Sequence, residues 1–528
     1  MLLNSSSRNG LCLLFIALSL HTCAAVRSLE IDTTVGTVYG LVNGTHPDVA
    51  QFLSIPFAEP PVGDLRWMPS VTKSPVASVD ATKFSPSCPQ YDTSIPSVYE
   101  IDSRGFLISG PTSEDCLTLS IWAPYASKSN CTEQLPVIVW IYGGGQVTGG
   151  AQIEYQLPTP WVQRTQSHIV VQINYRLNIF GNPHAAGSVT VVRSVTGSSP
   201  MLNLGLLDQR LALEWVRSNI ANFGGNVSRI TLWGQSAGAG STDDYNFAYP
   251  ADPIISGIIL DSSSAIGAAP GADPQGLNFT FVARHFDCGN LTAADELSCM
   301  KNVSQSDIEA FVKSYQDAGT KPSISFTPIV DSVTLFANYT ARTLAGNFSK
   351  VPAIIGTNNN EGSSLTAWVN NGSTYNETAA NINTVQRACW AQQNTHNRYA
   401  ANATTFRYYY AGNFSNIAPR SWEGAYHSSE LPLIFGTHDI AHSASTPFEY
   451  AVSHRMQDLW LAFMQDPVNG LPGQGWNAYS PGGNAIEFAW NGQVTQAIPL
   501  SKFDANCEGS PATTPISGAV PPDHNSGL

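Results

Sequence analysis

The chain has 528 residues, and 43% of them are apolar, so it can bury a large core. Only 12% are charged, and the formal net charge is −14. This acidic balance argues against nucleic acid or an anionic membrane as the partner, because both would repel the chain. Composition therefore favours a globular protein with an acidic, polar surface.

Residues 1–25 have the pattern of a secretory signal. Arg8 gives the positive start, residues 11–20 (LCLLFIALSL) are apolar but too short to span a bilayer, and small residues follow at 22–25 (TCAA). The alternative is a buried N-terminal helix. No later stretch approaches the ~18 apolar residues of a membrane span. The tail lacks the hydrophobic end of a lipid-anchor signal. We therefore expect an extracellular protein without a transmembrane anchor.

Asn-x-Ser/Thr sequons are dense after this segment, chiefly between residues 278 and 413. Each alone is weak evidence, but the density predicts a glycosylated surface. The sequons are Asn43, Asn130, Asn226, Asn278, Asn290, Asn302, Asn338, Asn347, Asn371, Asn376, Asn402 and Asn413.

Seven cysteines lie beyond residue 25, and an oxidising compartment favours their pairing with one left over. They are Cys88, Cys116, Cys131, Cys288, Cys299, Cys389 and Cys507. No CxxC or His/Cys spacing is typical of a metal site, so we expect no metal.

Hydrophobic patterning predicts alternating strands and helices. Short alternating runs predict a small antiparallel sheet from residues 29–35, 37–42 and 52–56. Apolar runs predict strands at 117–122, 136–142, 169–175, 229–233, 255–260 and 354–357. Helical spacing from Leu204 to Trp215 predicts a helix that ends at 223–226. The alternation predicts a mostly parallel sheet with helices on both faces. Residues 85–115 read as a loop, and 362–425 as helical and loop-rich.

The stretch 231–240 (TLWGQSAGAG) organises the functional prediction. It contains a Gly-x-Ser-x-Gly pattern at 234–238, between a predicted strand and a predicted helix. Such a sharp turn needs small residues on either side of the serine. It would hold the Ser236 hydroxyl at the carboxyl end of a strand, beside helix amides that can stabilise negative charge. We predict that Ser236 attacks an ester carbonyl.

A nucleophilic serine needs a base, and the base needs an orienting acid. In this architecture the order along the chain is serine, acid, histidine. His427, in a loop before a predicted helix, is the candidate base; His438 is the alternative, and a capping or surface role is the other reading of His427. Glu361, just past a predicted strand, is the candidate acid, unless it is a solvated loop charge. The glycines at 143–145 follow a buried strand and could offer amides to an oxyanion, although such a triplet is more often a flexible turn.

Seven segments together resemble the type-B carboxylesterase, lipase and cholinesterase family, in particular its secreted fungal-type carboxylesterases. They are residues 54–66 (SIPFAEPPVGDLR), 113–117 (SEDCL), 139–145 (VWIYGGG), 174–176 (NYR), 203–210 (NLGLLDQR), 234–238 (GQSAG) and 356–362 (GTNNNEG). The resemblance covers about residues 29–500. It implies an α/β-hydrolase fold, with a large, mostly parallel twisted sheet flanked by helices and a small N-terminal antiparallel sheet. We expect one such domain at 26–505, between the signal at 1–25 and a flexible tail at 506–528.

The resemblance also implies roles for individual residues. Ser236 would be the nucleophile, His427 the base and Glu361 the acid. The family's oxyanion hole corresponds to the amides of Gly144, Gly145 and Ala237. Its disulfides correspond to Cys88–Cys116 and Cys288–Cys299, and its buried ion pairs to Arg66–Glu114 and Arg176–Asp208. The substrate would be a small-molecule ester, and no cofactor is expected.

Departures from the family pattern bear on the substrate. Gln146 stands where the family usually has an aromatic residue, and we expect it to reshape the acyl pocket. The loop 88–116 lacks the tryptophan of a choline cage and is rich in charged residues, unlike an apolar lid. A hydrolase of soluble esters is therefore favoured over a lipase or sterol esterase. A non-catalytic binding or adhesion protein is disfavoured because all three triad residues are present.

Overall fold

The computed structural model describes residues 26, 28–125, 134–188, 202–267, 271, 273, 275–504 and 507. The predicted signal at 1–25, the sequon at Asn130, Cys131 and all of the predicted tail except Cys507 lie outside these residues. Within the described ranges, no helix combines the length and the apolar character needed to cross a membrane.

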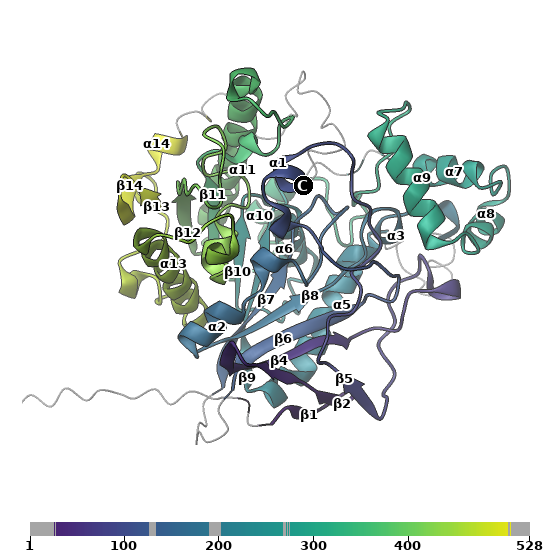
Figure 1. The fold of residues 1–528 in the computed structure, drawn as a ribbon, viewed down its shortest axis with the longest axis horizontal. Helices are drawn as coiled ribbons and strands as arrows, with labels where there is room; N and C mark the ends of the chain where they lie inside the picture. Colours follow the sequence, from purple (N-terminus) through teal and green to yellow (C-terminus); the bar gives the residue numbers. More distant parts are fainter. Residues whose placement is uncertain are drawn as a thin grey trace, which may run out of the picture.

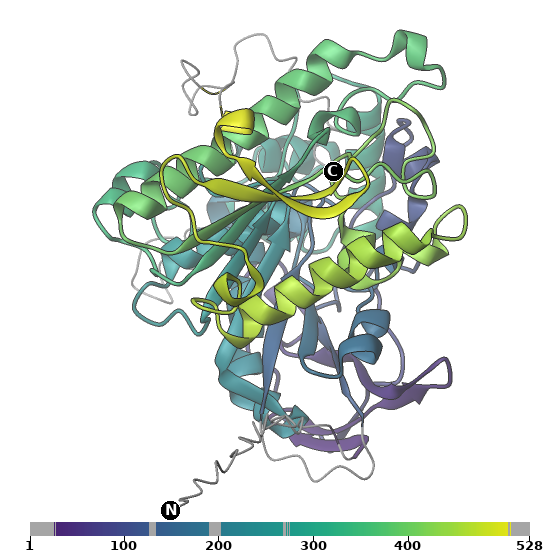
Figure 2. The ribbon, with the colours of Figure 1, turned by 90° about the vertical axis from the view of Figure 1, so that its left-hand side faces the viewer.

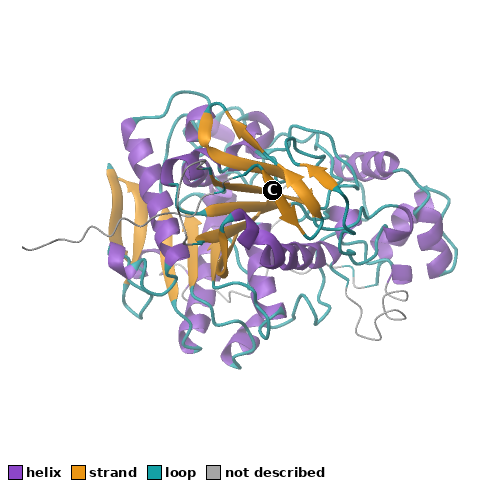
Figure 3. Cartoon of the chain, turned by 90° about the horizontal axis from the view of Figure 1, so that it is seen from below, coloured by secondary structure: helices purple, strands orange, loops and turns teal. Residues whose placement is uncertain are grey.

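A sheet of 11 strands runs through the molecule (Figures 1 and 3), and its strand order is β14-β13-β12-β11-β10-β9-β7-β8-β6-β4-β3. The strands are β3 (Leu41–Asn43), β4 (His46–Pro56), β6 (Thr118–Pro124), β7 (Leu135–Ile141), β8 (Ile169–Ile173), β9 (Gly225–Gln235), β10 (Gly257–Asp261), β11 (Ala353–Asn358), β12 (Thr405–Tyr410), β13 (Asn484–Trp490) and β14 (Gln493–Pro499). The six neighbouring pairs from β8 to β13 are parallel, and the outer pairs are antiparallel. The expected mostly parallel sheet is confirmed.

Helices cover both faces of this sheet (Figures 1 and 2). One layer contains α2 (Thr159–Thr165), α12 (Leu431–Phe435) and α13 (Pro447–Gln465), and the other contains α5 (Leu204–Asn219), α6 (Ala237–Ala248) and α11 (Glu377–Ala400). All residues of β7, β8 and β10 are buried. Strands covered on both faces need such continuous apolar runs, which is why they were recognisable in the sequence.

The small N-terminal sheet contains β1 (Glu30–Thr33), β2 (Gly36–Tyr39) and β5 (Ser78–Asp80). β1 and β2 are antiparallel, as expected, whereas β5 joins β2 in parallel. The run 52–56 was wrongly assigned to this sheet, because it ends β4, which pairs with β6 in the large sheet. Phe52 and Ile55 are fully buried there.

The prediction for residues 362–425 missed a strand. β12 lies between β11 and β13 inside the parallel part of the sheet, and the 24-residue helix α11 precedes it. All six residues of β12 are buried, so they show no alternation of apolar and polar residues, and Arg407 interrupts the apolar run.

A lobe of three helices lies to one side of the sheet (Figure 1). It contains α7 (Leu277–His285), α8 (Ala293–Met300) and α9 (Gln305–Asp317), whose apolar side chains pack in one core together with Trp67 and Phe180. The Cys288–Cys299 disulfide connects the end of α7 to α8. A further disulfide, Cys389–Cys507, ties α11 to the C-terminal residues, a pairing the sequence had not indicated.

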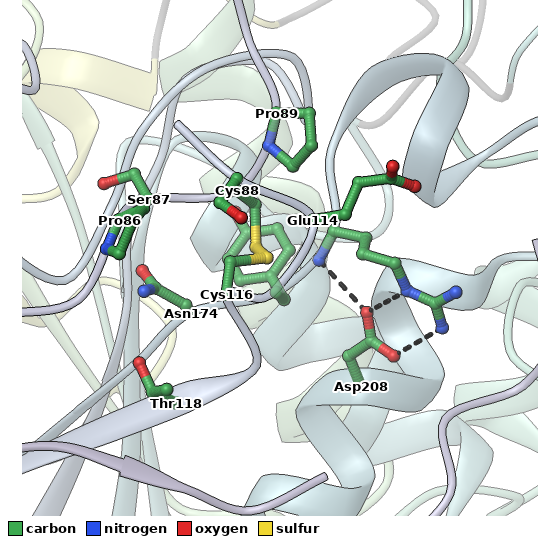
Figure 4. The surroundings of a disulfide bond; sticks show 12 residues. Pro86, Ser87, Cys88, Pro89, Glu114, Cys116, Thr118, Asn174 and Asp208 are labelled. Carbon is green, nitrogen blue, oxygen red and sulfur yellow. Dashed lines mark hydrogen bonds and ion pairs between the residues drawn. A yellow bond between two sulfur atoms is a disulfide. The ribbon is translucent and has the colours of Figure 1, made fainter. Parts of the chain in front are cut away.

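The Cys88–Cys116 disulfide closes the base of the loop that carries α1 (Val98–Ile101). Figure 4 shows it near Thr118, the first residue of β6. Both ion pairs implied by the resemblance are buried. Nε of Arg66 lies 2.7 Å from Glu114 Oε1, and Nε of Arg176 lies 2.8 Å from Asp208 Oδ2.

Candidate active site

Ser236 stands at the sharp turn between β9 and α6. Its backbone angles are φ 55° and ψ −126°, a region that L-residues rarely occupy, and α6 begins at the next residue. Its N–H donates to the Asp261 carbonyl at the end of β10, at 2.9 Å. Strain of this kind persists only where the surroundings enforce it, and it is typical of functional sites. The turn therefore has the geometry expected of a nucleophile elbow.

Close packing explains the glycines that flank Ser236. A Cβ at Gly234 would lie 2.2 Å from the Gly238 carbonyl oxygen, and a Cβ at Gly238 would lie 2.1 Å from the Ile141 carbonyl oxygen. A Cβ at Gly143 would lie 3.0 Å from Ser236 Cβ. The glycine turn that follows β7 therefore lies directly against the elbow.

His427 and Glu361 form a fully buried pair. Nδ1 of His427 lies 2.6 Å from Glu361 Oε2, and neither side chain is exposed. Glu361 follows β11, and His427 lies in the loop before α12, as the sequence predicted. The carboxylate accepts the proton of Nδ1, so the neutral ring presents Nε2 as its basic atom.

That basic atom lies at the elbow. His427 Nε2 is 3.2 Å from the side-chain nitrogen of Gln235, the residue immediately before Ser236. His438, the alternative base, lies elsewhere: its Nδ1 is 2.7 Å from Ser445 Oγ and 3.6 Å from Glu449. The structure thus brings His427, rather than His438, together with Glu361 and the elbow.

The electrostatics favour a neutral base beside an ionised acid. Burial lowers the pKa of His427, the nearby Arg387 guanidinium lowers it further, and Glu361 opposes both. Burial raises the pKa of Glu361, but its interaction with His427, the charge of Arg387 and a hydrogen bond from Ser262 outweigh this effect and leave that pKa lowered. Arg387, on α11, is held by a 2.8 Å hydrogen bond from Nη1 to the Ser262 carbonyl.

Two other carboxyl groups lie close to this pair. Asp261 accepts hydrogen bonds from Trp233 Nε1 (2.5 Å) and from the Tyr408 hydroxyl (2.8 Å), and burial raises its pKa to about 7. Burial also raises the pKa of Glu430 well above its usual value. Both groups hold a proton more readily than ordinary carboxyls, which limits the negative charge close to Glu361.

The three positions expected to supply oxyanion donors lie at this junction. Gly144 (φ +108°) and Gly145 (φ +63°) form the turn after β7, and Ala237 is the first residue of α6. The Gly144 carbonyl accepts hydrogen bonds from the N–H groups of Val147 and Thr148, which closes the turn. Backbone amides in such a turn and at a helix N-terminus are suited to a developing oxyanion.

The side chain of Gln146, which we expected to reshape the acyl pocket, contacts helix α6. Its side-chain nitrogen donates to Ser241 Oγ at 2.6 Å and to the Ala237 carbonyl at 3.3 Å. It therefore ties the glycine turn to α6. These contacts indicate that Gln146 braces the elbow.

Asn358 is a site residue that sequence reasoning missed. Its N–H donates to Glu361 Oε1 at 2.8 Å, while its side chain donates to the Tyr426 carbonyl at 2.7 Å and to Glu430. One residue thus connects the strand of the acid to the loop of the base. In the sequence, only its position three residues before Glu361 could have indicated this role. Because residues 359 and 360 are also asparagines, that position did not distinguish Asn358 from its neighbours. Within the described parts of the chain, no group of His, Cys, Asp and Glu side chains could hold a metal ion.

Comparison with known proteins agrees with this fold. Residues 27–412 match the carboxylesterase family. The chain belongs to this family, and it is a carboxylic ester hydrolase with the α/β-hydrolase fold.

Three relatives illustrate the range of the family. The chain is 43% identical over 496 residues to a chlorogenic acid esterase of Aspergillus niger, and the match covers 91% of this chain and 94% of that protein. It is 40% identical over 520 residues to secreted lipase 5 of Gibberella zeae, with the same shares covered. It is 33% identical over 366 residues to an acetylcholinesterase of Electrophorus electricus, covering 66% of this chain and 54% of that protein.

Proposed function

We propose that this protein is a secreted serine esterase that works through an acyl-enzyme on Ser236. One observation carries the proposal: Nδ1 of His427 is bound to Glu361 while Nε2 lies at the strained elbow that holds Ser236. A neutral imidazole held in this way is a general base at neutral pH.

In the first half of the reaction, the Ser236 hydroxyl attacks the ester carbonyl carbon and its proton passes to His427 Nε2. The carbonyl oxygen becomes an oxyanion, which the amides of Gly144, Gly145 and Ala237 stabilise. The tetrahedral intermediate then collapses. The bond to the alcohol breaks, the alcohol leaves with the proton from His427, and the acyl group stays on Ser236.

In the second half, water gives a proton to His427 Nε2 and its oxygen attacks the acyl carbon. A second tetrahedral intermediate forms, and its collapse frees the carboxylic acid and returns the proton to Ser236. Glu361 keeps its charge throughout, fixes the tautomer of His427 and stabilises the imidazolium. The low pKa of Glu361 supports this role.

The substrate we propose is a soluble ester. The loop 88–116 exposes Asp92 and Arg104, whose side chains are 66% and 59% accessible, and such charges disfavour contact with a lipid surface. Because one relative is named a chlorogenic acid esterase and another a secreted lipase, both substrate classes require a test. Rates should be measured for chlorogenic acid and for p-nitrophenyl esters of increasing acyl length. We expect turnover of chlorogenic acid or of short acyl esters, and a preference for long chains would favour the lipase or sterol esterase instead.

We also propose that the signal at 1–25 is removed on secretion and that residues 26–505 form a single catalytic domain. Three disulfides suit an oxidising compartment. Of the predicted glycosylation sites, nine are exposed: Asn43, Asn290, Asn302, Asn338, Asn347, Asn371, Asn376, Asn402 and Asn413. Asn278 is part-buried and its side chain donates to the Ser325 carbonyl at 2.9 Å, which makes it a poor acceptor. N-terminal sequencing and glycopeptide mapping of the exported protein test these points.

Removal of the nucleophile tests the mechanism. Ser236→Ala should lose ~10³-fold or more of the ester hydrolysis rate while the protein remains folded. Ser256→Ala is a matched control, because that part-buried serine lies before β10 and its hydroxyl donates to the Ile230 carbonyl, away from the elbow. Near-wild-type turnover by a folded Ser236→Ala variant would overturn the proposal.

A further inference from the structure

The loop between Cys88 and Cys116 makes a direct contact with the main chain of the proposed base. Tyr99, on α1, is 3% exposed, and its hydroxyl donates to the His427 carbonyl at 2.6 Å. The same hydroxyl lies 3.0 Å from Ser364 Oγ, three residues after Glu361. The Tyr99 ring packs edge-to-face against Phe106 and Tyr426. Tyr99 therefore contacts both segments that carry the proposed base and acid.

Asp102 fastens the same loop a few residues further on. It accepts a two-pronged ion pair from Arg420, at 2.7 Å from Nε and 2.9 Å from Nη2. It also accepts a hydrogen bond from Trp368 Nε1 at 2.6 Å. The Arg420 guanidinium stacks 4.7 Å above the Trp368 ring, and the His442 imidazole contacts the Asp102 carbonyl. Two-pronged pairs of this kind fix orientation as well as distance.

Ser103 adds a third attachment, because its hydroxyl lies 2.9 Å from the hydroxyl of Tyr426, the residue before His427. The segment 97–106 is thus bound to residues 364–368, to residues 417–427 and to His442. Outward movement of the loop would break all of these contacts together and would release the His427 carbonyl.

We propose that Tyr99 is a positioning residue for His427, and that the loop 88–116 is a fixed wall of the active site rather than a flap that opens onto lipid. This inference rests on the proposed role of His427, and it gives a structural reason for the proposed preference for dissolved esters. The Tyr99 hydroxyl anchors the main chain from which the imidazole projects. Loss of that anchor lets Nε2 move away from Ser236, and small displacements of a catalytic group are costly in rate.

A matched pair of tyrosine variants tests the positioning role. In Tyr99→Phe, kcat should fall about 10- to 100-fold, the order of effect of a small misplacement, while KM stays within about twofold. The rate at which a fluorophosphonate labels Ser236 should fall in parallel. Tyr91→Phe is the control, because Tyr91 lies in the same loop but packs against the α7–α9 lobe. Unchanged kcat in a folded Tyr99→Phe, or equal losses in both variants, would overturn the positioning role.

A matched pair of arginine variants tests whether the loop is fixed. Arg420→Gln breaks the pair with Asp102, whereas Arg104→Gln breaks pairs with Glu100 and Asp92 that lie wholly within the loop. Hydrogen exchange in residues 97–106 should be slow in the wild type and in Arg104→Gln, and fast in Arg420→Gln. Wild-type turnover of a long-chain ester should show no jump where the ester exceeds its solubility limit. Fast exchange in the wild type, or such a jump, would overturn the fixed wall.

These outcomes separate the inference from the function on which it rests. If the wild type neither hydrolyses esters nor is labelled by the fluorophosphonate, the proposed function fails, whatever the exchange data show. If the wild type is active and Tyr99→Phe matches it, only the positioning role fails.

Discussion

The Nδ1 atom of His427 lies 2.6 Å from Oε2 of Glu361, and both side chains are completely buried. The other Glu361 oxygen is held by the Asn358 N–H, so the carboxylate cannot turn away without losing a second bond. This relationship fixes which nitrogen of the imidazole is free to accept a proton.

Glu361→Gln should therefore reduce kcat strongly without unfolding the protein. An amide at this position can present its NH₂ group to Nδ1, which favours the tautomer with the proton on Nε2, and that tautomer cannot act as the base. The expected loss is ~10⁴-fold, the size seen for the equivalent change in serine proteases. Glu377→Gln, in the exposed first turn of α11, is the control. Steady-state kinetics on both variants make the comparison, and a loss below tenfold would count against the role of Glu361.

The charge of Arg387 should influence the pH dependence of the reaction through the pKa of His427. Burial and the Arg387 charge both lower the pKa of His427, so the acid limb of kcat/KM should lie below the ordinary imidazole value of ~6.5. Arg387→Met removes a positive charge beside the imidazole, which makes protonation easier and should move the limb to higher pH. Lys350→Met removes an exposed charge and should leave the limb in place. Identical profiles for wild type and Arg387→Met would show that the guanidinium does not influence the base.

The raised pKa of Asp261 should make the stability of the protein depend on pH. Its folded-state pKa of about 7 lies above the unfolded value of ~3.9, so the folded protein binds the extra proton between these two values. Its contribution to stability is therefore complete below about pH 4 and decreases as the pH rises towards 7. Asp261→Asn has no such proton, yet its amide can accept from Trp233 and donate to the Tyr408 oxygen.

The melting temperature of Asp261→Asn, measured relative to that of the wild type, should therefore be higher at pH 8 than at pH 5. Paired thermal unfolding curves at the two pH values measure this shift. The Asp261 charge also raises the pKa of Glu430, so its removal in the variant lowers that pKa and shifts the difference in the same direction. If the difference in melting temperature were the same at both pH values, it would contradict the raised pKa of Asp261.

The sequence was most informative where a local pattern reflects a local constraint. The glycines around Ser236 are required by contacts below 2.5 Å that any Cβ would make, so the elbow was visible as a motif. The strands of the parallel core were visible as apolar runs because both of their faces are covered. The order serine, acid, histidine along the chain then narrowed the candidates, and the family resemblance selected Glu361 and His427 among them.

The sequence was least informative where a role depends on distant contacts. Nothing around Tyr99 indicates that its hydroxyl meets the carbonyl of residue 427, which lies 328 positions away. Asn358 looks like its neighbours until the fold brings it between the acid and the base. β12 was missed because a fully buried strand with an arginine in it resembles neither an amphipathic strand nor an apolar run.

The most direct test of the central claim is the mass of the protein after reaction with a fluorophosphonate, followed by peptide mapping. The wild type should gain one adduct, located on Ser236, with loss of ester hydrolysis in proportion to labelling. Ser236→Ala should gain none. An adduct on another residue, or an unlabelled wild type that still hydrolyses esters, would contradict the assignment of Ser236 as the nucleophile.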